Sequence, residues 1–383
     1  MAGENRTAES TDGSPYDVVV VGAGAAGVGV GISLQHVGIE NYVVVDRASV
    51  GASFAAWPAE TRFITPSFPS NSIGMLDLNS IGIGISPAFN MRIEHPTGPE
   101  YAEHLQSLAE FFELPLRENT DVLSIEKKDD LFHLETKKET LLAKNVIWAA
   151  GEYQYPSLGV FDGSETCRHT STIASYTELE GDDFLIVGGY ESGIDAAYHL
   201  AKNDKNVRVF DLNRPWAEAS SDPSIALSTF SFERMRHEKF GANVELFEET
   251  GVQSVAHEDG LYTLTTDKGQ VFQSATQPIL ANGFDGSHKF VSHLFEQRDD
   301  GFPSVNEKDE STIVPGMYLC GPSVRHDGHI FCFIFKYRQR FGIVVEAIAS
   351  SLGLETEDFV EAYKSWGMYL DDLSCCGQEC LTC

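Results

Sequence analysis

Cysteines are scarce outside the last residues of this sequence. Three of the seven, Cys167, Cys320 and Cys332, lie in the body of the 383-residue chain. They form neither a C-x-x-C nor a C-x4-C pair, which excludes an internal dithiol of either spacing and argues against a disulfide framework. Cys320 and Cys332 lie in the apolar stretches LCG and FCF, so we predict that both are small core residues.

Positive charge and long hydrophobic runs are also scarce. No apolar run reaches the roughly 18–20 residues that span a bilayer. The 57 acidic residues outnumber the 27 basic ones, and the formal net charge is −30. A field of that sign repels nucleic acid and anionic membrane surfaces, so neither is an expected partner. Residues 1–15 are polar and lack the apolar core of a signal peptide, which predicts a disordered lead-in and a cytoplasmic protein.

A glycine-rich turn between two apolar strands is the strongest pattern that is present. YDVVVVGAGAAGVGVGISLQHVGIENYVVVDR predicts a buried strand over residues 17–21, a helix, and a second strand that ends at Asp46. The G-x-G-x-x-G spacing suits a tight turn, a close approach of amides to a pyrophosphate, and close helix–strand packing, while Asp46 would accept hydrogen bonds from a ribose. The predicted dinucleotide-binding residues are Gly22, Gly24, Ala25, Ala26, Gly27, Asp46 and Arg47.

The same scheme recurs in EGDDFLIVGGYESGIDAAYHLAKNDKNVRVFDLNR, with strands expected at 183–187 and 207–211. Position 190 is tyrosine where the pattern has its middle glycine, so this side chain either points outward or fills the site. Asp211 would favour NADH, Arg214 would favour the 2′-phosphate of NADPH, and a domain that no longer binds nicotinamide is the third alternative. The predicted residues are Gly188, Gly189, Tyr190, Glu191, Ser192, Gly193, Asp211 and Arg214.

The order of the two motifs resembles the two-dinucleotide-binding-domain flavoproteins, in which the first site holds FAD and the second NAD(P)H. Three further stretches resemble the family's two crossovers and its closing strand–turn–helix: KNVIWAAGEYQYP (144–156), QPILANGF (277–284) and PGMYLCGPSVRHDGHIFCFIFKYRQRFGIVVEAI (315–348). The resemblance implies an α/β fold of two Rossmann-like domains, with the nicotinamide-type domain inserted in the FAD domain. The expected segments are a lead-in (1–15), the FAD domain (16–155 and 285–350), the nicotinamide-type domain (156–284), and a C-terminal helix with a cysteine-rich tail (351–383).

The same resemblance suggests which residues lie near the flavin. The commonest members place an aspartate after the glycine of the closing turn, but here Pro322 and Ser323 follow Gly321, so the ribityl contact would come from backbone or from Ser323. The loop after Asp46 resembles a wall against the flavin ring, although its aromatic residues are equally typical of ordinary core. The expected flavin-side residues are Ser53, Phe54, Trp57, Ala150, Gly151, Gly321, Pro322 and Ser323.

The sequence resembles two different groups within these flavoproteins. FDGSETCRHTSTIASY is a degenerate match to the linker motif of flavin monooxygenases, with His169 too far from Gly163. WPAETRFITPSF and GGYESGIDAA are nearer to the bacillithiol-disulfide-reductase-like branch of the pyridine nucleotide-disulfide reductases. That branch places a cysteine in the first glycine motif, where this chain has Ala25 and Ala26.

The ending LSCCGQECLTC contains the other four cysteines and resembles the tail of mercuric reductases. The predicted catalytic thiols are Cys375 and Cys376, and the predicted ligands of a soft metal or an iron–sulfur centre are Cys375, Cys376, Cys380 and Cys383. A redox relay and an idle tail are the two alternatives.

These patterns predict a FAD-dependent oxidoreductase and a homodimer. Hydride would pass from NADH or NADPH to the flavin and on to a disulfide, a thiol-bound metal or a similar small-molecule acceptor. A monooxygenase of a small substrate, and a flavin-bearing metal-binding or sensor protein with a non-functional nicotinamide site, are the alternatives. His326 and His329, placed by the pattern at the start of the last long helix, are either proton donors or turn residues.

Overall fold

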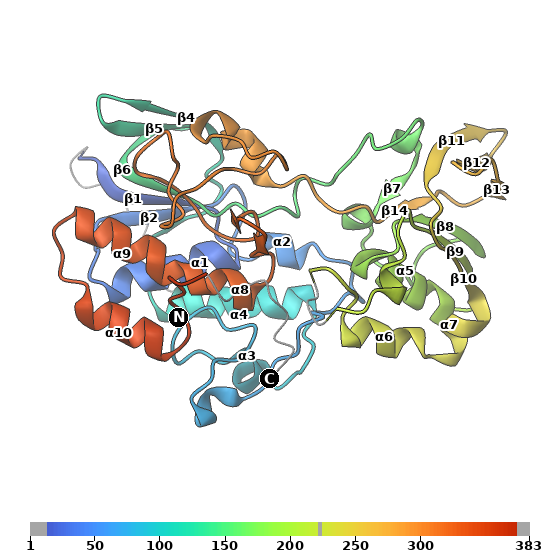
Figure 1. Ribbon diagram of the computed structural model, residues 1–383, viewed down its shortest axis with the longest axis horizontal. Helices are drawn as coiled ribbons and strands as arrows, with labels where there is room; N and C mark the ends of the chain where they lie inside the picture. The colour runs from blue at the N-terminus through green and yellow to red at the C-terminus, as the bar shows by residue number, and fades with distance from the viewer. Residues whose placement is uncertain (1–13, 221–223, 374–383) are drawn as a thin grey trace, which may run out of the picture.

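A computed structural model describes residues 14–220 and 224–373, which form two lobes (Figure 1). The first lobe contains a seven-stranded sheet whose central strands are buried and rich in valine, the pattern that favours parallel pairing. The strands are β3 (Leu116–Arg117), β2 (Tyr42–Val45), β1 (Tyr16–Val21), β6 (Thr140–Trp148), β5 (Leu131–Thr136) and β4 (Val122–Lys128) in order, with β15 (Met317–Leu319) beside β6. Two strands pair with the same edge of the longest strand, β6. Its first half pairs antiparallel with β5, and its second half pairs parallel with β15.

Helices cover this sheet, and α1 lies against both α4 and α9. The start of α4 is fixed by a capping box, in which Thr97 Oγ1 accepts from the amide of Glu100 while the Glu100 carboxylate accepts from the amide of Thr97. The helical segments of this lobe are α1 (Ala25–His36), α2 (Ala52–Ala55), η1 (Ser70–Ile73), α3 (Pro87–Met91), α4 (Gly98–Phe111), η5 (Ser287–Leu294), α8 (Ile334–Tyr337), η6 (Arg338–Arg340), α9 (Phe341–Ser351) and α10 (Glu357–Ser365).

The second lobe repeats the arrangement on a smaller scale. Its parallel sheet runs in the order β10 (Val244–Phe247), β9 (Asn206–Phe210), β8 (Asp183–Val187), β14 (Ile279–Leu280) and β7 (Arg168–His169). The helices are α5 (Glu191–Lys202), α6 (Thr229–Met235) and α7 (Glu238–Asn243), with short turns η2 (Ser164–Thr166), η3 (Thr170–Thr172) and η4 (Pro215–Ala217). A separate antiparallel sheet contains β11 (Val252–Glu258), β12 (Leu261–Thr266) and β13 (Val271–Ser274). The predicted α/β class with two Rossmann-like units is confirmed.

Two linkers join the lobes and run side by side, as the antiparallel bridge between Pro156 and Phe284 shows. These residues lie at the predicted domain boundaries, which we retain as a proposal. Within the described ranges, no helix has the length and apolar character needed to cross a membrane.

One local prediction is wrong. The segment from Arg325 to His329 does not open a helix, because it forms the hairpin β16 (Arg325–His326) and β17 (His329–Ile330). Asp327 takes a left-handed φ of +48° at its tip, which breaks a helix and which aspartate tolerates better than most residues. The next helix begins only at Ile334.

Candidate dinucleotide-binding sites

The turn between β1 and α1 leaves open space in front of the helix. Gly22 has a φ of +109°, and a Cβ on it would lie 2.5 Å from the carbonyl oxygen of Ala149. A Cβ on Gly27 would lie 1.7 Å from the carbonyl oxygen of Gly22, so only glycine allows the helix and the strand to pack this closely. A Cβ on Gly24, the N-cap of α1, would meet nothing within 4 Å. The amides that begin α1 therefore face a space suited to a diphosphate.

Asp46 lies beside this turn, which we call the first cradle (residues 22–27). Its Oδ2 accepts from the amide of Ala23 at 2.8 Å and its Oδ1 from the amide of Ala48 at 2.8 Å. Burial raises the pKa of Asp46, while these two hydrogen bonds oppose that rise. Arg47 and Ala48 line a cavity of about 290 Å³ together with residues 119–121 and 136–139. Because each carboxylate oxygen has a second lone pair, Asp46 can still accept from a ribose, and that contact remains a prediction.

The turn after β15 reaches the same place. Gly321 has a φ of +107°, and a Cβ on it would lie 3.3 Å from the Cβ of Ala26. Ser323 is buried, with its Oγ 3.2 Å from Nδ1 of His288. The carboxyl ends of β1, β6 and β15 thus meet at the first cradle, where the sequence predicted a single site. These residues fit FAD: residues 22–27 would hold its diphosphate, and Asp46 and Arg47 its adenosine part.

The aromatic residues of the loop after Asp46 pack against one another and against the core of the first lobe. The ring of Phe54 lies 5.4 Å from that of Trp57, 5.6 Å from that of Phe63 and 5.0 Å from that of Tyr101. Trp57 and Phe63 are 5.1 Å apart. These mutual contacts fit the ordinary-core interpretation of the loop, while contact of the flavin with Ser53, Phe54 or Trp57 remains a prediction.

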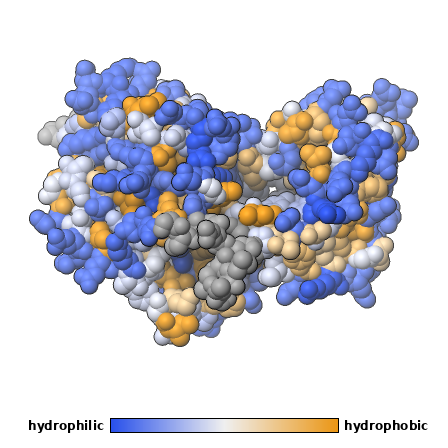
Figure 2. Space-filling view, viewed as in Figure 1, coloured by the Kyte–Doolittle hydropathy of each residue, from blue (hydrophilic) through white to orange (hydrophobic). Residues whose placement is uncertain are grey.

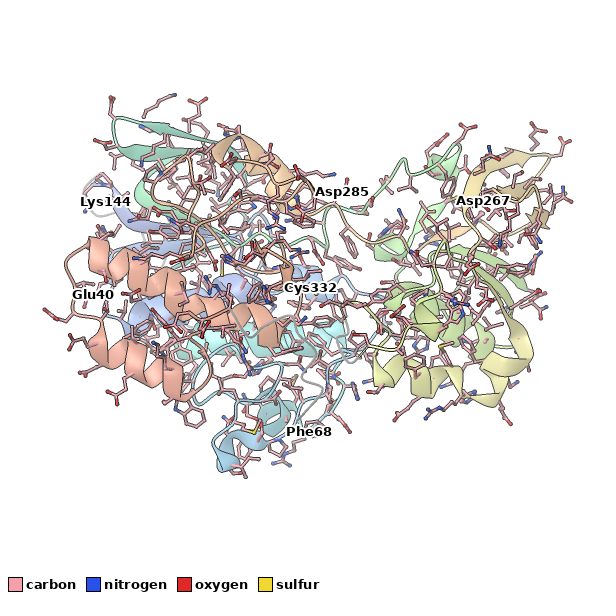
Figure 3. The ribbon with its side chains drawn as sticks, viewed as in Figure 1. Glu40, Phe68, Lys144, Asp267, Asp285 and Cys332 are labelled. Atoms are coloured by element: carbon pink, nitrogen blue, oxygen red, sulfur yellow. The ribbon has the colours of Figure 1, made fainter. Side chains whose placement is uncertain are left out.

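Cys332 lies between the two lobes, whereas the sequence predicted a core position (Figure 3). Its Sγ is 3.1 Å from the hydroxyl oxygen of Ser224, which also accepts from the ammonium of Lys336 at 2.9 Å. Burial raises the pKa of Cys332, and Ser224 and Lys336 act in the opposite direction. Glu152, which lies within the first crossover, also has its pKa raised by burial. No local sequence pattern predicts the contact between Cys332 and Ser224, because the two residues are 108 positions apart. Cys320, in contrast, is buried as predicted.

We call the turn between β8 and α5 the second cradle (residues 188–193). Its backbone resembles that of the first cradle, but its side chains differ. Gly188 has a φ of +101°, and a Cβ on Gly193 would lie 1.9 Å from the carbonyl oxygen of Gly188. Asp211 accepts from the amide of Gly189 at 2.6 Å, as Asp46 does from Ala23. The Tyr190 hydroxyl, however, donates to the carbonyl oxygen of Ala226 at 2.9 Å. As these side chains stand, the second cradle does not fit a dinucleotide.

Other predicted residues of this lobe are spread around the cradle. Glu191 begins α5, and its carboxylate accepts from the amide of Ser228. Ser192 follows it in the first turn of the helix. Arg214 is more than half exposed and lies 4.0 Å from Glu248 and from Glu249, so two carboxylates already face the group that was expected to favour NADPH.

A polar seam joins the lobes on the side of α5. The Glu60 carboxylate accepts from the hydroxyl groups of Ser175 and Thr177 and from the amide of Tyr176 at 3.0 Å. Thr61 donates to the buried Asp195 of α5 at 2.7 Å. Burial alone would raise the pKa of Glu60, but the hydrogen bonds outweigh it and lower the pKa to about 2.

Replacing Glu60 by glutamine is expected to weaken the folded state only where the carboxylate is ionised. Since the pKa falls from 4.5 to about 2 on folding, its stabilising contribution is complete above pH 4.5 and is lost as the pH drops toward 2. Urea unfolding should separate wild type from Glu60→Gln most at about pH 7 and least at about pH 3. The exposed Glu355, replaced by glutamine, is the matched control. A difference that grows toward pH 3 would contradict this assignment.

The histidines singled out in the sequence have structural partners. His169 is buried, with Nδ1 2.9 Å from the Ser171 hydroxyl oxygen and Nε2 3.0 Å from the carbonyl oxygen of Gly283. His326 Nε2 bonds the buried Asp309. Both rings are thus held in place by the fold, which favours packing and turn roles over proton donation.

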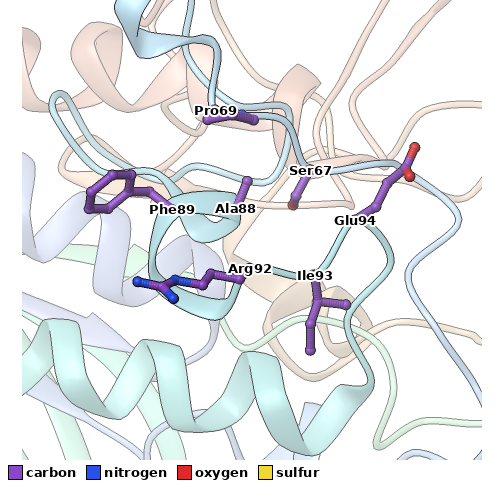
Figure 4. Close-up of a pocket in the computed structure, with 7 residues that line it drawn as sticks. All are labelled: Ser67, Pro69, Ala88, Phe89, Arg92, Ile93 and Glu94. Atoms are coloured by element: carbon purple, nitrogen blue, oxygen red, sulfur yellow. The ribbon is translucent and has the colours of Figure 1, made fainter.

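The remaining surface is mostly hydrophilic on the face drawn in Figure 2, with apolar residues gathered at the lower end of the first lobe. Ile73, Met75 and Phe89 are more than half exposed there. A cavity of about 350 Å³ lies beside them, between Ser67, Pro69, α3 and residues 92–94 (Figure 4). Its lining combines apolar side chains with one arginine and one glutamate, and it is separate from both cradles.

The predicted tail site, Cys375, Cys376, Cys380 and Cys383, lies outside the described residues. Within residues 14–220 and 224–373, no group of three His, Cys, Asp or Glu side chains is placed to hold a metal ion. The metal and relay hypotheses for the tail remain predictions.

Comparison with known proteins gives a consistent result. Residues 19–321 match the family described as pyridine nucleotide-disulphide oxidoreductase. An uncharacterised CzcO-like oxidoreductase of Geobacillus kaustophilus is 33% identical over 113 residues, 28% of this chain and only 32% of that relative's length. Bacilliredoxin reductase Bdr of Bacillus subtilis is 24% identical over 347 residues, 86% of this chain and 97% of the relative. Bacillithiol disulfide reductase Bdr from Staphylococcus aureus matches with a TM-score of 0.72 and 18% identity over 88% of this chain and 99% of that one.

Two Rossmann-like units, each with a glycine-rich turn between its first strand and the following helix, together with the family match, indicate the class of the flavin-dependent oxidoreductases. The chain belongs to the pyridine nucleotide-disulphide oxidoreductase family. The expected likeness to the bacillithiol-disulfide-reductase branch is confirmed.

Proposed function

We propose that this chain is a FAD-dependent oxidoreductase that reduces a small acceptor containing a disulfide or a thiol-bound metal. The observation that supports it most is the open first cradle, where a Cβ on Gly24 would meet nothing within 4 Å. FAD would supply the electron transfer there, and the chain would bind and orient it. The disulfide acceptor is suggested by the names of the Bdr relatives.

The residues around the first cradle have distinct parts in this proposal. Amides of residues 24–27 would hold the diphosphate at the start of α1. Asp46 accepts from the amide of Ala23 in the cradle, and Arg47 borders the adjoining cavity. Ala150 and Gly151 lie on the first crossover and residues 321–323 on the closing turn, where a Cβ on Gly321 would lie 3.3 Å from the Cβ of Ala26. The domain boundaries, the homodimer and the cytoplasmic location remain parts of the proposal.

The purified protein is expected to bind about one FAD per chain, because the first of the two cradles is open at the start of its helix. The measurement is an absorbance spectrum followed by anaerobic titration with NADH and, separately, NADPH. Reduced enzyme should then be reoxidised by a small symmetrical disulfide such as cystine. Protein that remains colourless with excess FAD would overturn the proposal, and reoxidation by oxygen alone would favour a monooxygenase or an oxidase.

The tail hypothesis has its own test. A chain that ends at Leu373 is expected to be reduced as fast as the full chain but to turn over the acceptor at least about tenfold more slowly, a loss that corresponds to about 1.4 kcal/mol in the barrier. Stopped-flow reduction and steady-state turnover measure the two steps separately. Equal turnover of the two chains would remove Cys375 and Cys376 from the mechanism.

A further inference from the structure

The two cradles allow a comparison within one molecule. Their N-cap residues have almost the same backbone angles: φ −82° and ψ −166° at Gly24, φ −83° and ψ −164° at Tyr190. A side chain at either position therefore leaves the backbone in the same direction relative to the following helix. At Gly24 that direction is open for 4 Å, so at position 190 it is the direction that the tyrosine side chain takes. The Cβ of Tyr190 thus enters the position that is open in front of Gly24 in the first cradle.

The hydroxyl group of Tyr190 is held by a hydrogen bond. Its hydroxyl donates to the carbonyl oxygen of Ala226 at 2.9 Å, and its ring packs against the apolar core of the second lobe. Ala226 and its neighbour Leu227 are buried, so the segment that receives the hydrogen bond is itself part of the core. The ring therefore has partners at both ends, unlike a tyrosine that points into solvent.

Glu191 adds a negative charge at the same helix start. Its carboxylate accepts from the amide and the hydroxyl group of Ser228 and, at 2.6 Å, from the hydroxyl group of Ser231. These residues begin α6, with Ser228 as its N-cap. A carboxylate so placed both occupies the favourable end of the α5 dipole and repels an incoming diphosphate.

Trp216 reinforces the closure from the other side of the turn. A Cβ on Gly189 would lie 2.3 Å from the ring of Trp216, and 3.2 Å from the Cβ of Asp211. The equivalent residue of the first cradle, Ala23, carries a Cβ. The indole ring of Trp216 in η4 therefore fills the space beside Gly189 that a Cβ would need. In the first cradle this space is taken by the Cβ of Ala23.

We propose that Tyr190 and Glu191 form a latch with residues 226–231 that closes the second cradle and makes these two residues the determinants of nicotinamide binding. A nucleotide binds with its diphosphate on α5 only when the tyrosine ring and the Ala226 hydrogen bond are displaced. This inference rests on the proposed function, since it concerns the electron-donor site of the same enzyme.

The test measures affinity for NAD⁺ and NADP⁺, which cannot reduce the flavin, by calorimetry of the FAD-loaded full chain. Wild type is expected to bind either nucleotide weakly, and Tyr190→Gly at least about tenfold more tightly, since one hydrogen bond and the packing of a ring no longer have to be broken. Tyr190→Phe keeps the ring and loses only the hydroxyl, so its gain should be smaller. Tyr198→Phe makes the same change elsewhere on α5 and should leave the affinity unchanged.

Tyr190→Gly that binds no more tightly than wild type overturns the latch, whatever the wild-type affinity is. Glu191→Gln provides a second variant that keeps the size of the side chain, and it should also tighten binding if its charge opposes the diphosphate. Retained FAD and a cooperative thermal unfolding transition show that the variants are folded. Tighter nucleotide binding in Tyr190→Gly without flavin reduction by NADH or NADPH would leave the latch in place and refute the proposed function.

Discussion

Gly24→Tyr is expected to yield a folded protein that has lost FAD. The substitution copies into the first cradle the residue that the second cradle already contains at the same backbone angles. Because a Cβ at Gly24 meets nothing within 4 Å and the backbone angles match those of Tyr190, the backbone can carry a side chain at this position. Its ring would nevertheless enter the space in front of α1, where the diphosphate needs the helix amides.

We expect FAD affinity to fall at least about a hundredfold, which corresponds to about 2.7 kcal/mol. The measurement is the ratio of flavin to protein after purification, followed by titration of the apoprotein with FAD. Gly24→Ala adds only the Cβ and should cost much less, so the series separates the ring from the loss of glycine itself.

The matched control is Gly241→Tyr, because Gly241 is exposed on α7 of the other lobe and a Cβ there also meets nothing within 4 Å. This variant should keep its FAD. A Gly24→Tyr protein that is as yellow as wild type would show that the diphosphate does not lie at the start of α1, and the assignment of the first cradle would be wrong.

The first cradle was predictable from sequence because its physics is local. The features that form it lie within about thirty residues: a valine strand, three glycines, and an acidic residue after the next strand. Each of them can be recognised from residue type and spacing alone. The strand predicted at 17–21 is observed at Tyr16–Val21, and the one predicted at 183–187 is Asp183–Val187.

The contents of the second cradle were not predictable in the same way. The sequence showed that Tyr190 replaces a glycine, but its destination depends on Ala226, 36 residues away. No local pattern distinguishes a ring that points outward from one that is hydrogen bonded into the lobe. The same limit applies to Cys332, whose apolar neighbours in sequence suggested a core position although its partner Ser224 belongs to the other lobe.

The hairpin at Arg325–Ile330 could have been recognised. The triplet of His326, Asp327 and Gly328 is typical of turns, but the family resemblance favoured an early helix start. Here the turn pattern in the sequence agrees with the structure, whereas the helix start expected from the family resemblance does not. The same hairpin also brings His326 to Asp309, a contact that no sequence spacing indicates.

Asp309→Ala is expected to be among the most destabilising single substitutions in the described chain. Asp309 is fully buried, and its Oδ2 accepts from Nε of Arg340 at 3.0 Å while its Oδ1 accepts from Nη2 at 2.9 Å and from His326. Arg340 is 1% exposed and also donates to the carbonyl oxygens of Glu307 and Leu370. Removing the carboxylate leaves the guanidinium charge buried without its anion, at a cost of roughly 3–5 kcal/mol.

Urea unfolding of the FAD-loaded protein measures this loss. Asp300→Ala is the control, because Asp300 pairs with Arg298 at the surface, where an ion pair contributes about 0–1 kcal/mol. The double variant Asp309→Leu with Arg340→Met removes both charges together, so it should be less destabilised than the sum of its two single variants. The network joins the end of β15, which precedes the turn at Gly321, to the start of α9 and to the segment at Leu370. If Asp309→Ala costs no more than Asp300→Ala, the buried pair does not hold the closing segment of the first lobe, and the position of Gly321 beside Ala26 must be maintained by apolar packing alone.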